Sequence, residues 1–140
     1  MPSVFTRIIE GELPGTFVWR DPECVAFLSI NPMHAGHTLV VPRLEVDHWI
    51  DLEPTLAGHL FQVAQLIGRA QKESLSPRRI GVIIAGDEVP HTHLHVVPFD
   101  SVGELSFANA DANPPAGSLD AAAEMIRAAL LDLGAEHVAS

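Results

Sequence analysis

Cysteine is nearly absent from this sequence, since Cys24 is the only one among 140 residues. A single thiol excludes an intramolecular disulfide and any zinc site that is built from several cysteines. Cys24 begins the apolar run Cys-Val-Ala-Phe-Leu, which predicts a buried and unreactive thiol.

Positive charge is scarce as well. Lys72 is the only lysine, Lys and Arg together number 8, and the formal net charge is −10. Binding to the phosphate backbone of nucleic acid needs a basic surface, so nucleic acid is not an expected partner. An anionic small molecule remains compatible with this charge if backbone amides and histidines supply the local donors.

Long apolar runs are also missing. No stretch approaches the roughly 20 apolar residues needed to span a bilayer, and the N-terminal Met-Pro-Ser-Val-Phe-Thr-Arg lacks the features of a signal peptide. We therefore expect a cytoplasmic protein with no membrane partner. An apolar fraction of 47% over 140 residues predicts one folded domain spanning residues 1–140.

The periodicity of the apolar residues predicts both strands and helices. Leu56, Leu60, Val63, Ala64 and Ile67 recur at helical spacing, which predicts a long helix with Asp51 as its N-cap and Pro54 in its first turn. The expected strands are 16–20, 24–28, 37–42, 80–84 and 91–99. The other expected segments are a short helix within 4–12, a surface loop over 100–117 and a last helix over 118–134 that Ser118 caps. This order predicts an α+β domain with an antiparallel sheet.

Three of the eight histidines fall within five residues, as His91-Thr-His93-Leu-His95. Alternation at period two is typical of a strand, so the three imidazoles are expected on one face, roughly 6.5–7 Å apart. Solvated surface histidines, a metal site and a nucleophile or acid–base site all remain open. Two imidazoles at this spacing can share a zinc ion. A neutral imidazole can also attack phosphorus while its neighbours donate to the phosphate oxygens. Residue types alone do not separate the last two hypotheses.

The stretch from His91 to Val97 resembles the His-x-His-x-His-x-x signature of the histidine-triad (HIT) superfamily. Residues 5–14 resemble the N-terminal segment of that family, and residues 26–32 with 36–42 resemble its nucleotide-side loop and the following strand. The resemblance spans about residues 4–99. It implies a HIT-like fold, in which a five-stranded antiparallel sheet carries one long and one or two shorter helices. It also implies a homodimer whose subunits join their sheets.

The resemblance assigns roles to four histidines. His93 corresponds to the nucleophile, His95 to the residue that binds a phosphate oxygen, His91 to the residue that orients the nucleophile, and His37 to a fourth histidine close to the triad. In the nucleotidyltransferase branch a Gln typically stands where this chain has His95, so His95 indicates hydrolysis.

The resemblance also implies contacts to a purine nucleotide. Ser29 and Ile30 stand where the family holds the ribose, and Gly86, Asp87 and Glu88 stand where main-chain donors meet the phosphate. Such preorganised donors stabilise the charge that develops when a phosphate is displaced. No metal and no cofactor is expected to take part.

The chain departs from the family pattern at several positions. Many relatives carry Cys-x-Phe-Cys and bind a structural zinc, whereas this chain has Ser3-Val-Phe-Thr6, so that zinc site is expected to be absent. Ser29 replaces a usual Asp, and Asp87 replaces a common Gln. The usual Asn-Gly segment before Gly86 is missing. The acidic pair Asp87-Glu88 must turn away from a phosphate, pair with an arginine, or lower the affinity for polyphosphates.

Four functions compete on this basis. The favoured one is hydrolysis or transfer at the α-phosphorus of a purine nucleoside monophosphate conjugate, through a nucleotidyl-histidine intermediate on His93. The alternatives are hydrolysis of dinucleoside polyphosphates by the same residues and a catalytically weak nucleotide-binding module. A metal-dependent hydrolase is the remaining rival.

The other histidines and the aromatic residues have simpler interpretations. His48, His59 and His137 are expected at the surface or at helix edges, and His34 is as well placed to border the pocket as to lie outside it. Trp19 and Phe27 have the strand spacing typical of core residues.

Overall fold

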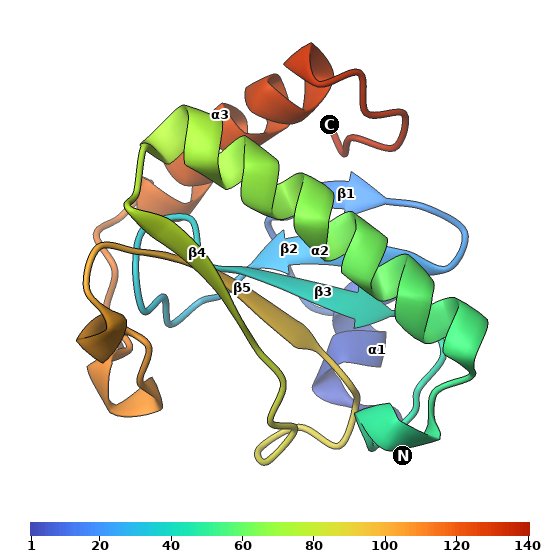
Figure 1. Ribbon diagram of the computed structural model, residues 1–140. Coiled ribbons are helices and arrows are strands. Elements are labelled where there is room, and N and C mark those ends of the chain that lie inside the picture. The colour runs from blue at the N-terminus through green and yellow to red at the C-terminus, as the bar shows by residue number, and fades with distance from the viewer.

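The computed structural model describes residues 1–140 and contains a five-stranded antiparallel sheet with helices on both faces (Figure 1). The strands are β1 (Phe17–Arg20), β2 (Cys24–Leu28), β3 (Thr38–Pro42), β4 (Arg79–Ile83) and β5 (Leu94–Phe99), in the spatial order β1-β2-β3-β5-β4. The α-helices are α1 (Val4–Ile9), α2 (Pro54–Leu75) and α3 (Ser118–Asp132). Three short 3-10 turns are η1 (Trp49–Asp51), η2 (Val102–Glu104) and η3 (Phe107–Asn109). The predicted α+β class and antiparallel sheet are confirmed.

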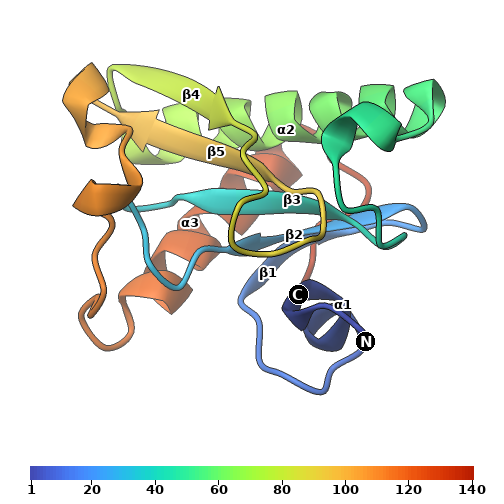
Figure 2. The ribbon, with the colours of Figure 1, turned by 90° about the horizontal axis from the view of Figure 1, so that it is seen from below.

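Strands β2 and β3 bury side chains on both faces, which explains why they are apolar throughout except for Thr38. On one face, Val40 and Val96 join the larger core formed with α2 and α3. On the other, Phe27 and Leu39 pack in a smaller core with Phe5 of α1. Figure 2 shows α1 and α2 on opposite sides of the sheet. The buried positions of Trp19, Cys24 and Phe27 agree with the sequence-based expectation.

The predicted N-cap of the long helix is wrong, whereas Pro54 lies in its first turn as predicted. Asp51 belongs to η1, and α2 begins at Pro54 with Glu53 in the N-cap position. The reason is local: the residue before a proline is driven into extended backbone, and Glu53 has φ −60° and ψ 136°. Proline is favoured at the first helical position because that residue has no helical N–H partner to lose.

The predicted start of the fifth strand is also wrong. Strand β5 begins at Leu94, so His91 and His93 precede it. Their backbone bonds lie outside the sheet ladder, because the amide of His91 donates to the Val89 carbonyl and that of Thr92 to the Val46 carbonyl. Only His95 lies within the sheet, opposite Leu39 of β3 and Ile83 of β4.

The segment 100–117 is not a simple surface loop, because it contains η2 and η3 and docks against the loop that precedes β3. The amide of Asp111 donates to the Pro32 carbonyl at 2.9 Å, and Asn31 Nδ2 donates to the Asp111 carbonyl at 3.3 Å. The segment ends at Gly117, whose φ of 80° precedes α3, so Ser118 is the first helical residue rather than the predicted cap.

The two edges of the sheet differ. Strand β1 pairs outward with the C-terminal segment, where the amide of Arg20 donates to the His137 carbonyl and that of Ala139 to the Val18 carbonyl. Strand β4 has β5 on one side and no strand on the other. None of the helices combines the length and apolar character needed to cross a membrane.

Candidate active site

A cavity of about 790 Å³ lies on the face of the sheet opposite α2. It is within the range of roughly 300–1,000 Å³ that small-molecule sites occupy. Its walls come from α1, β2, β3, β5, the segment before β5 and the segment 107–112. Among the residues predicted for the site, the cavity is lined by His37, His93, His95, Ser29, Ile30, Gly86, Asp87 and Glu88.

His93 presents an unprotonated nitrogen to the cavity. Its Nδ1 lies 2.8 Å from the His91 carbonyl, which can only accept, so Nδ1 carries the proton. In the neutral ring Nε2 therefore keeps its lone pair, and no group of the protein bonds to this nitrogen. Burial lowers the pKa of His93, although the bond to the His91 carbonyl and the charge of Glu88 oppose that shift. The neutral, nucleophilic form is favoured.

His37 and His95 form a hydrogen-bonded relay in which each ring carries its proton on Nε2, the opposite nitrogen from that of His93. The amide of Met33 donates to His37 Nδ1 at 3.1 Å, so the proton of neutral His37 is on Nε2. That proton is donated to His95 Nδ1 at 2.9 Å. His95 therefore keeps its own proton on Nε2, where no other group of the protein accepts it. The cavity thus contains one imidazole lone pair and one imidazole N–H donor on neighbouring rings, whose centroids are 4.8 Å apart.

Burial keeps this relay neutral. Burial, with a smaller contribution from the neighbouring imidazoles, lowers the pKa of His37 to about 4 and that of His95 to about 3. At neutral pH neither ring is charged. A phosphate oxygen would therefore meet an N–H dipole rather than a cation.

The backbone that leads into His37 is held in place by Gly36 and Gln71. Gly36 has a φ of 88°, and a Cβ on it would overlap the side chain of Leu75. Its carbonyl accepts from Nε2 of the buried Gln71 at 2.9 Å, and the same nitrogen reaches the Val96 carbonyl at 2.9 Å. Helix α2 therefore ties the loop that delivers His37 to the strand that carries His95.

His91 does not line the cavity, contrary to the expectation that three imidazoles face it together. Its ring is fully buried beside Phe5, and its Nε2–H donates to the Pro42 carbonyl at 2.7 Å. The prediction assumed a regular strand from residue 91. The backbone is irregular over 91–93, so the three side chains do not share one face. His91 contacts His93 through its carbonyl oxygen.

The acidic pair lies at the rim of the cavity, and both side chains are exposed. Neither carboxylate forms an ion pair with an arginine. Of the three alternatives for this pair, neutralisation by an arginine is therefore excluded. Gly86, directly before them, has a φ of 72°, a left-handed conformation that glycine adopts without strain. The cavity lining includes no Lys or Arg.

One wall of the cavity was missed from the sequence. Phe107, Ala110 and Ala112 line it, and the Phe107 ring meets His95 edge-on with the centroids 5.2 Å apart. The available signal was an isolated aromatic residue in a polar segment. His34 lies outside the cavity and contacts Asp100 at 3.6 Å, across the same docked segment.

The remaining histidines take no part in the cavity. His48 and His137 are exposed, as expected. His59 is half-buried and bonds through Nε2 to the buried Asp21 at 2.7 Å. Burial raises the pKa of Asp21, but hydrogen bonds from Trp19, Cys24, Glu23 and His59 outweigh it and lower the pKa to about 2. Burial raises the pKa of the Cys24 thiol, in line with an unreactive core residue.

The fold and the histidine arrangement define a class of protein, and the comparison with family models agrees with it. The model described as HIT domain matches residues 10–102. The chain belongs to the HIT domain family.

Relatives of this chain are found in bacteria, archaea and plants. An uncharacterized HIT-like protein of Mycobacterium tuberculosis is 34% identical over 113 residues, which cover 77% of this chain and 78% of that protein. Adenylylsulfatase HINT3 of Arabidopsis thaliana is 28% identical over 68% of this chain, but the match covers only 51% of HINT3. A crystal structure of a zinc-bound histidine triad family protein from Mycobacterium smegmatis has a TM-score of 0.81 and 32% identity, over 94% of each chain.

The zinc of that relative raises the question of whether the residues here suit such an ion. Ser3 and Thr6 contribute neutral hydroxyls, whereas structural zinc sites use thiolates and imidazoles. Ser3 and Thr6 bond to one acidic residue, Glu45, and one imidazole, His91. The Glu45 Oε1 and His91 Nδ1 atoms are 3.9 Å apart. The potential ligand groups Asp21–Cys24–His59 and His34–Asp100–Glu104 include no cavity histidine. Both oxygens of Asp21 already accept hydrogen bonds. The residues present do not fit a closed zinc site.

The tautomers of the cavity histidines are directly measurable. We predict that two-bond ¹H–¹⁵N NMR spectra at pH 7 show the proton of His93 on Nδ1 and those of His37 and His95 on Nε2. Because the pKa values of His37 and His95 are lowered to about 4 and about 3, both rings should remain neutral until the pH falls below about 5. A His95 that titrates near pH 6.5 would contradict the buried relay.

Proposed function

We propose that this protein is a nucleotide hydrolase that acts at the α-phosphorus of a purine nucleoside monophosphate conjugate with an amine, acyl or nucleotide leaving group. The observation that carries the proposal is the pairing of a free imidazole lone pair on His93 with a free N–H donor on His95, inside one cavity. One group suits attack on phosphorus and the other suits a phosphate oxygen. Membership of the HIT domain family supports this assignment.

The chemistry proceeds in two steps. His93 Nε2 forms a bond to the α-phosphorus as the bond to the leaving group breaks, and the leaving group departs with its electron pair and gains a proton from solvent. Water then attacks the phosphorus, the P–N bond to His93 breaks, and the proton lost by the water returns to solvent. The products are the free nucleotide and the protonated leaving group, and no step is assigned to a metal ion.

The residues around His93 support the placement of a nucleotide. Ser29 and Ile30 lie on the same wall as Phe27, which suits a ribose and an apolar base surface. Ser29 Oγ already accepts from the Asn31 amide at 3.2 Å, so its hydroxyl proton remains available to a ligand. We assign the phosphate to the space between His95 and the backbone of Gly86, Asp87 and Glu88. The assignment of a purine follows the family resemblance.

The clearest test is His93→Ala, assayed on an adenosine phosphoramidate. Because the nucleophile is removed, kcat should fall by about 10³-fold or more. His48→Ala is the matched control, since His48 is exposed and outside the cavity, and it should retain the activity of the unmodified protein. Unchanged turnover by His93→Ala would remove the residue from the nucleophile role. Mononucleotide binding without turnover of any conjugate by the unmodified protein would favour the alternative of a nucleotide-binding module.

The charge at the rim separates two classes of substrate. With Asp87 and Glu88 unpaired and no Lys or Arg in the lining, each additional phosphate meets net repulsion. We predict that Asp87→Asn with Glu88→Gln raises kcat/KM for a dinucleoside polyphosphate by about 5-fold, equivalent to about 1 kcal/mol, and leaves that for a singly charged phosphoramidate within about 2-fold. The gain should shrink at high salt, where exposed charges are screened. A dinucleoside polyphosphate that is already the better substrate of the unmodified protein would contradict this preference.

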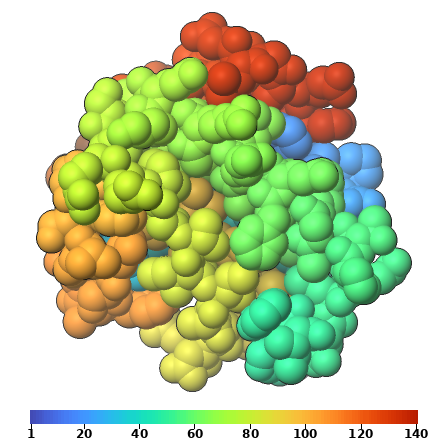
Figure 3. All heavy atoms as spheres, viewed as in Figure 1, coloured from blue at the N-terminus to red at the C-terminus, as the bar shows by residue number.

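We further propose that the active form is a homodimer joined at β4 and α2. Strand β4 is the sheet edge without a partner, and a groove beside it is lined by Phe61, Ile80 and Val82. Phe61 and Val82 are 49% and 46% exposed although both are large and apolar. Figure 3 shows the side chains of α2 and β4 as adjoining parts of one surface.

Light scattering during size-exclusion chromatography tests this interface. The unmodified protein should elute with twice the chain mass of 15.1 kDa, and Phe61→Arg should shift it to the monomer because an unpaired charge would be buried. Val102→Arg is the control, since Val102 is 71% exposed and does not line the groove. A dimer that survives Phe61→Arg, or dissociates equally with Val102→Arg, would place the interface elsewhere.

A further inference from the structure

The segment that carries His93 has no place in the sheet and is held by contacts from elsewhere. Strand β5 begins only at Leu94. Both the amide and the hydroxyl of Thr92 donate to the Val46 carbonyl, at 2.7 and 2.8 Å. The amide of His91 donates to the Val89 carbonyl at 2.8 Å. The position of His93 therefore depends on the residues that hold His91 and Thr92.

His91 connects this segment to a second polar cluster outside the cavity. Its Nε2–H is committed to the Pro42 carbonyl at 2.7 Å, so its Nδ1 must accept, and it does so from the Ser3 hydroxyl at 2.6 Å. The carbonyl of the same residue receives the Nδ1–H of His93 at 2.8 Å. One buried residue thus joins the cluster, through its ring, to the His93 ring, through its backbone.

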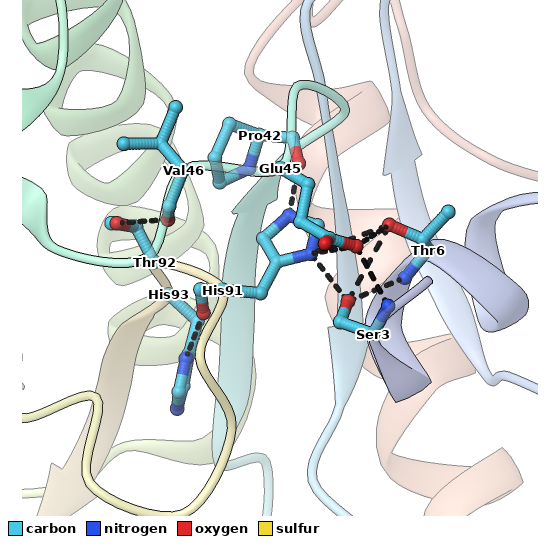
Figure 4. A network of polar contacts seen from close by, with 8 residues as sticks. All are labelled: Ser3, Thr6, Pro42, Glu45, Val46, His91, Thr92 and His93. Carbon is cyan, nitrogen blue, oxygen red and sulfur yellow. Dashed lines mark hydrogen bonds and ion pairs between the residues drawn. The ribbon is translucent and has the colours of Figure 1, made fainter. Parts of the chain in front are cut away.

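The outer part of the cluster fixes Ser3 itself. Glu45 Oε1 accepts from the Ser3 amide and from the Thr6 hydroxyl, both at 2.7 Å, and the Thr6 amide donates to Ser3 Oγ at 3.1 Å. Figure 4 shows these groups converging on the His91 ring, with His93 on the far side of His91. The hydrogen bonds from Ser3 and Thr6 lower the pKa of Glu45, so it stays an acceptor. The Ser3 hydroxyl lies closer to His91 Nδ1, at 2.6 Å, than to Thr6 Oγ1, at 3.4 Å, so its proton goes to His91.

None of the four residues touches the cavity, since Ser3, Thr6, Glu45 and His91 are all absent from its lining. They are also the residues that fail to fit a zinc site. Two hydroxyls and a carboxylate occupy this position as a complete hydrogen-bonded set, in which each proton has one acceptor. The cluster has the chemistry of a positioning device rather than of a ligand site.

We propose that Ser3, Thr6 and Glu45 are positioning residues that act through His91 to hold His93 Nε2 in line for attack. This inference rests on the nucleophile role proposed for His93. The ring of His93 is oriented by its bond to the His91 carbonyl and by the edge of Phe5, with the centroids 4.8 Å apart. Misplacing a reacting group by about 1 Å costs about 100-fold in rate. A loosened His91 should therefore slow the chemical step and leave substrate binding nearly unchanged.

The test compares variants that break the cluster with variants that preserve it. Ser3→Gly removes the hydroxyl and keeps a residue that is acceptable at a helix N-cap, so α1 is spared. Glu45→Ala removes the acceptor for Ser3 and Thr6, whereas Glu45→Gln retains an Oε1 that can accept from both. Glu10→Ala is the matched control, because Glu10 is an exposed acid of the same N-terminal region.

We expect Ser3→Gly and Glu45→Ala to lower kcat by about 10- to 100-fold with KM within about 2-fold. Glu45→Gln should recover most of kcat, and Glu10→Ala should leave both constants unchanged. The Nδ1–H signal of His93 should weaken in NMR spectra of Ser3→Gly, since a mobile His91 carbonyl no longer selects one tautomer. Folding is checked by circular dichroism at the assay temperature.

Two kinetic results would overturn the proposal. One is a folded Ser3→Gly and a folded Glu45→Ala that both keep kcat within about 2-fold of the unmodified protein. The other is a rise in KM with kcat unchanged, which indicates a damaged binding wall instead. The NMR signal of His93 needs no turnover, so an inactive unmodified protein would count against the proposed hydrolysis while the cluster is still tested by that signal. A tautomer unaffected by Ser3→Gly would overturn the cluster's role by itself.

Discussion

The hydrogen bond from His93 Nδ1–H to the His91 carbonyl determines which nitrogen faces the cavity, and the other polar groups of the site are arranged around that choice. An imidazole has two nearly equivalent tautomers, and a fixed carbonyl removes the equivalence. The relay from the Met33 amide through His37 selects the opposite tautomer for His95. Two identical side chains, two residues apart, thereby acquire opposite hydrogen-bonding capacities. Burial completes the distinction by keeping both rings neutral.

Much of the fold was predictable because it depends on short-range pattern. The spacing of Leu60, Val63 and Ile67 predicted α2, and the period-two alternation around His95 predicted a strand with the imidazole on one face. The family resemblance brought His37, Ser29 and Gly86 to the same cavity as His93, and the structure brings them together there. In each case residues close in sequence, or a familiar motif, contain the information.

The errors have a common physical origin in contacts between distant segments. Strand β5 starts late because Val46, over 40 residues away, takes the backbone and hydroxyl bonds of Thr92. Phe107 reaches His95 because Asp111 and Asn31 pin two loops together. His91 leaves the cavity because Pro42 and Ser3 bind its ring. Local periodicity contains no information on these contacts, because each one depends on a segment that is distant in the sequence.

The unequal edges of the sheet limit how copies of this chain can associate. Because residues 137–139 already occupy the outer side of β1, each chain exposes one unpaired strand edge and not two. Pairing two such edges uses up both of them, so the combined sheet has no exposed strand at which a third copy could add. In the proposed homodimer, sheet extension would therefore end with two copies. By covering the outer side of β1, residues 137–139 would prevent the open-ended polymers that sheets with two free edges can form.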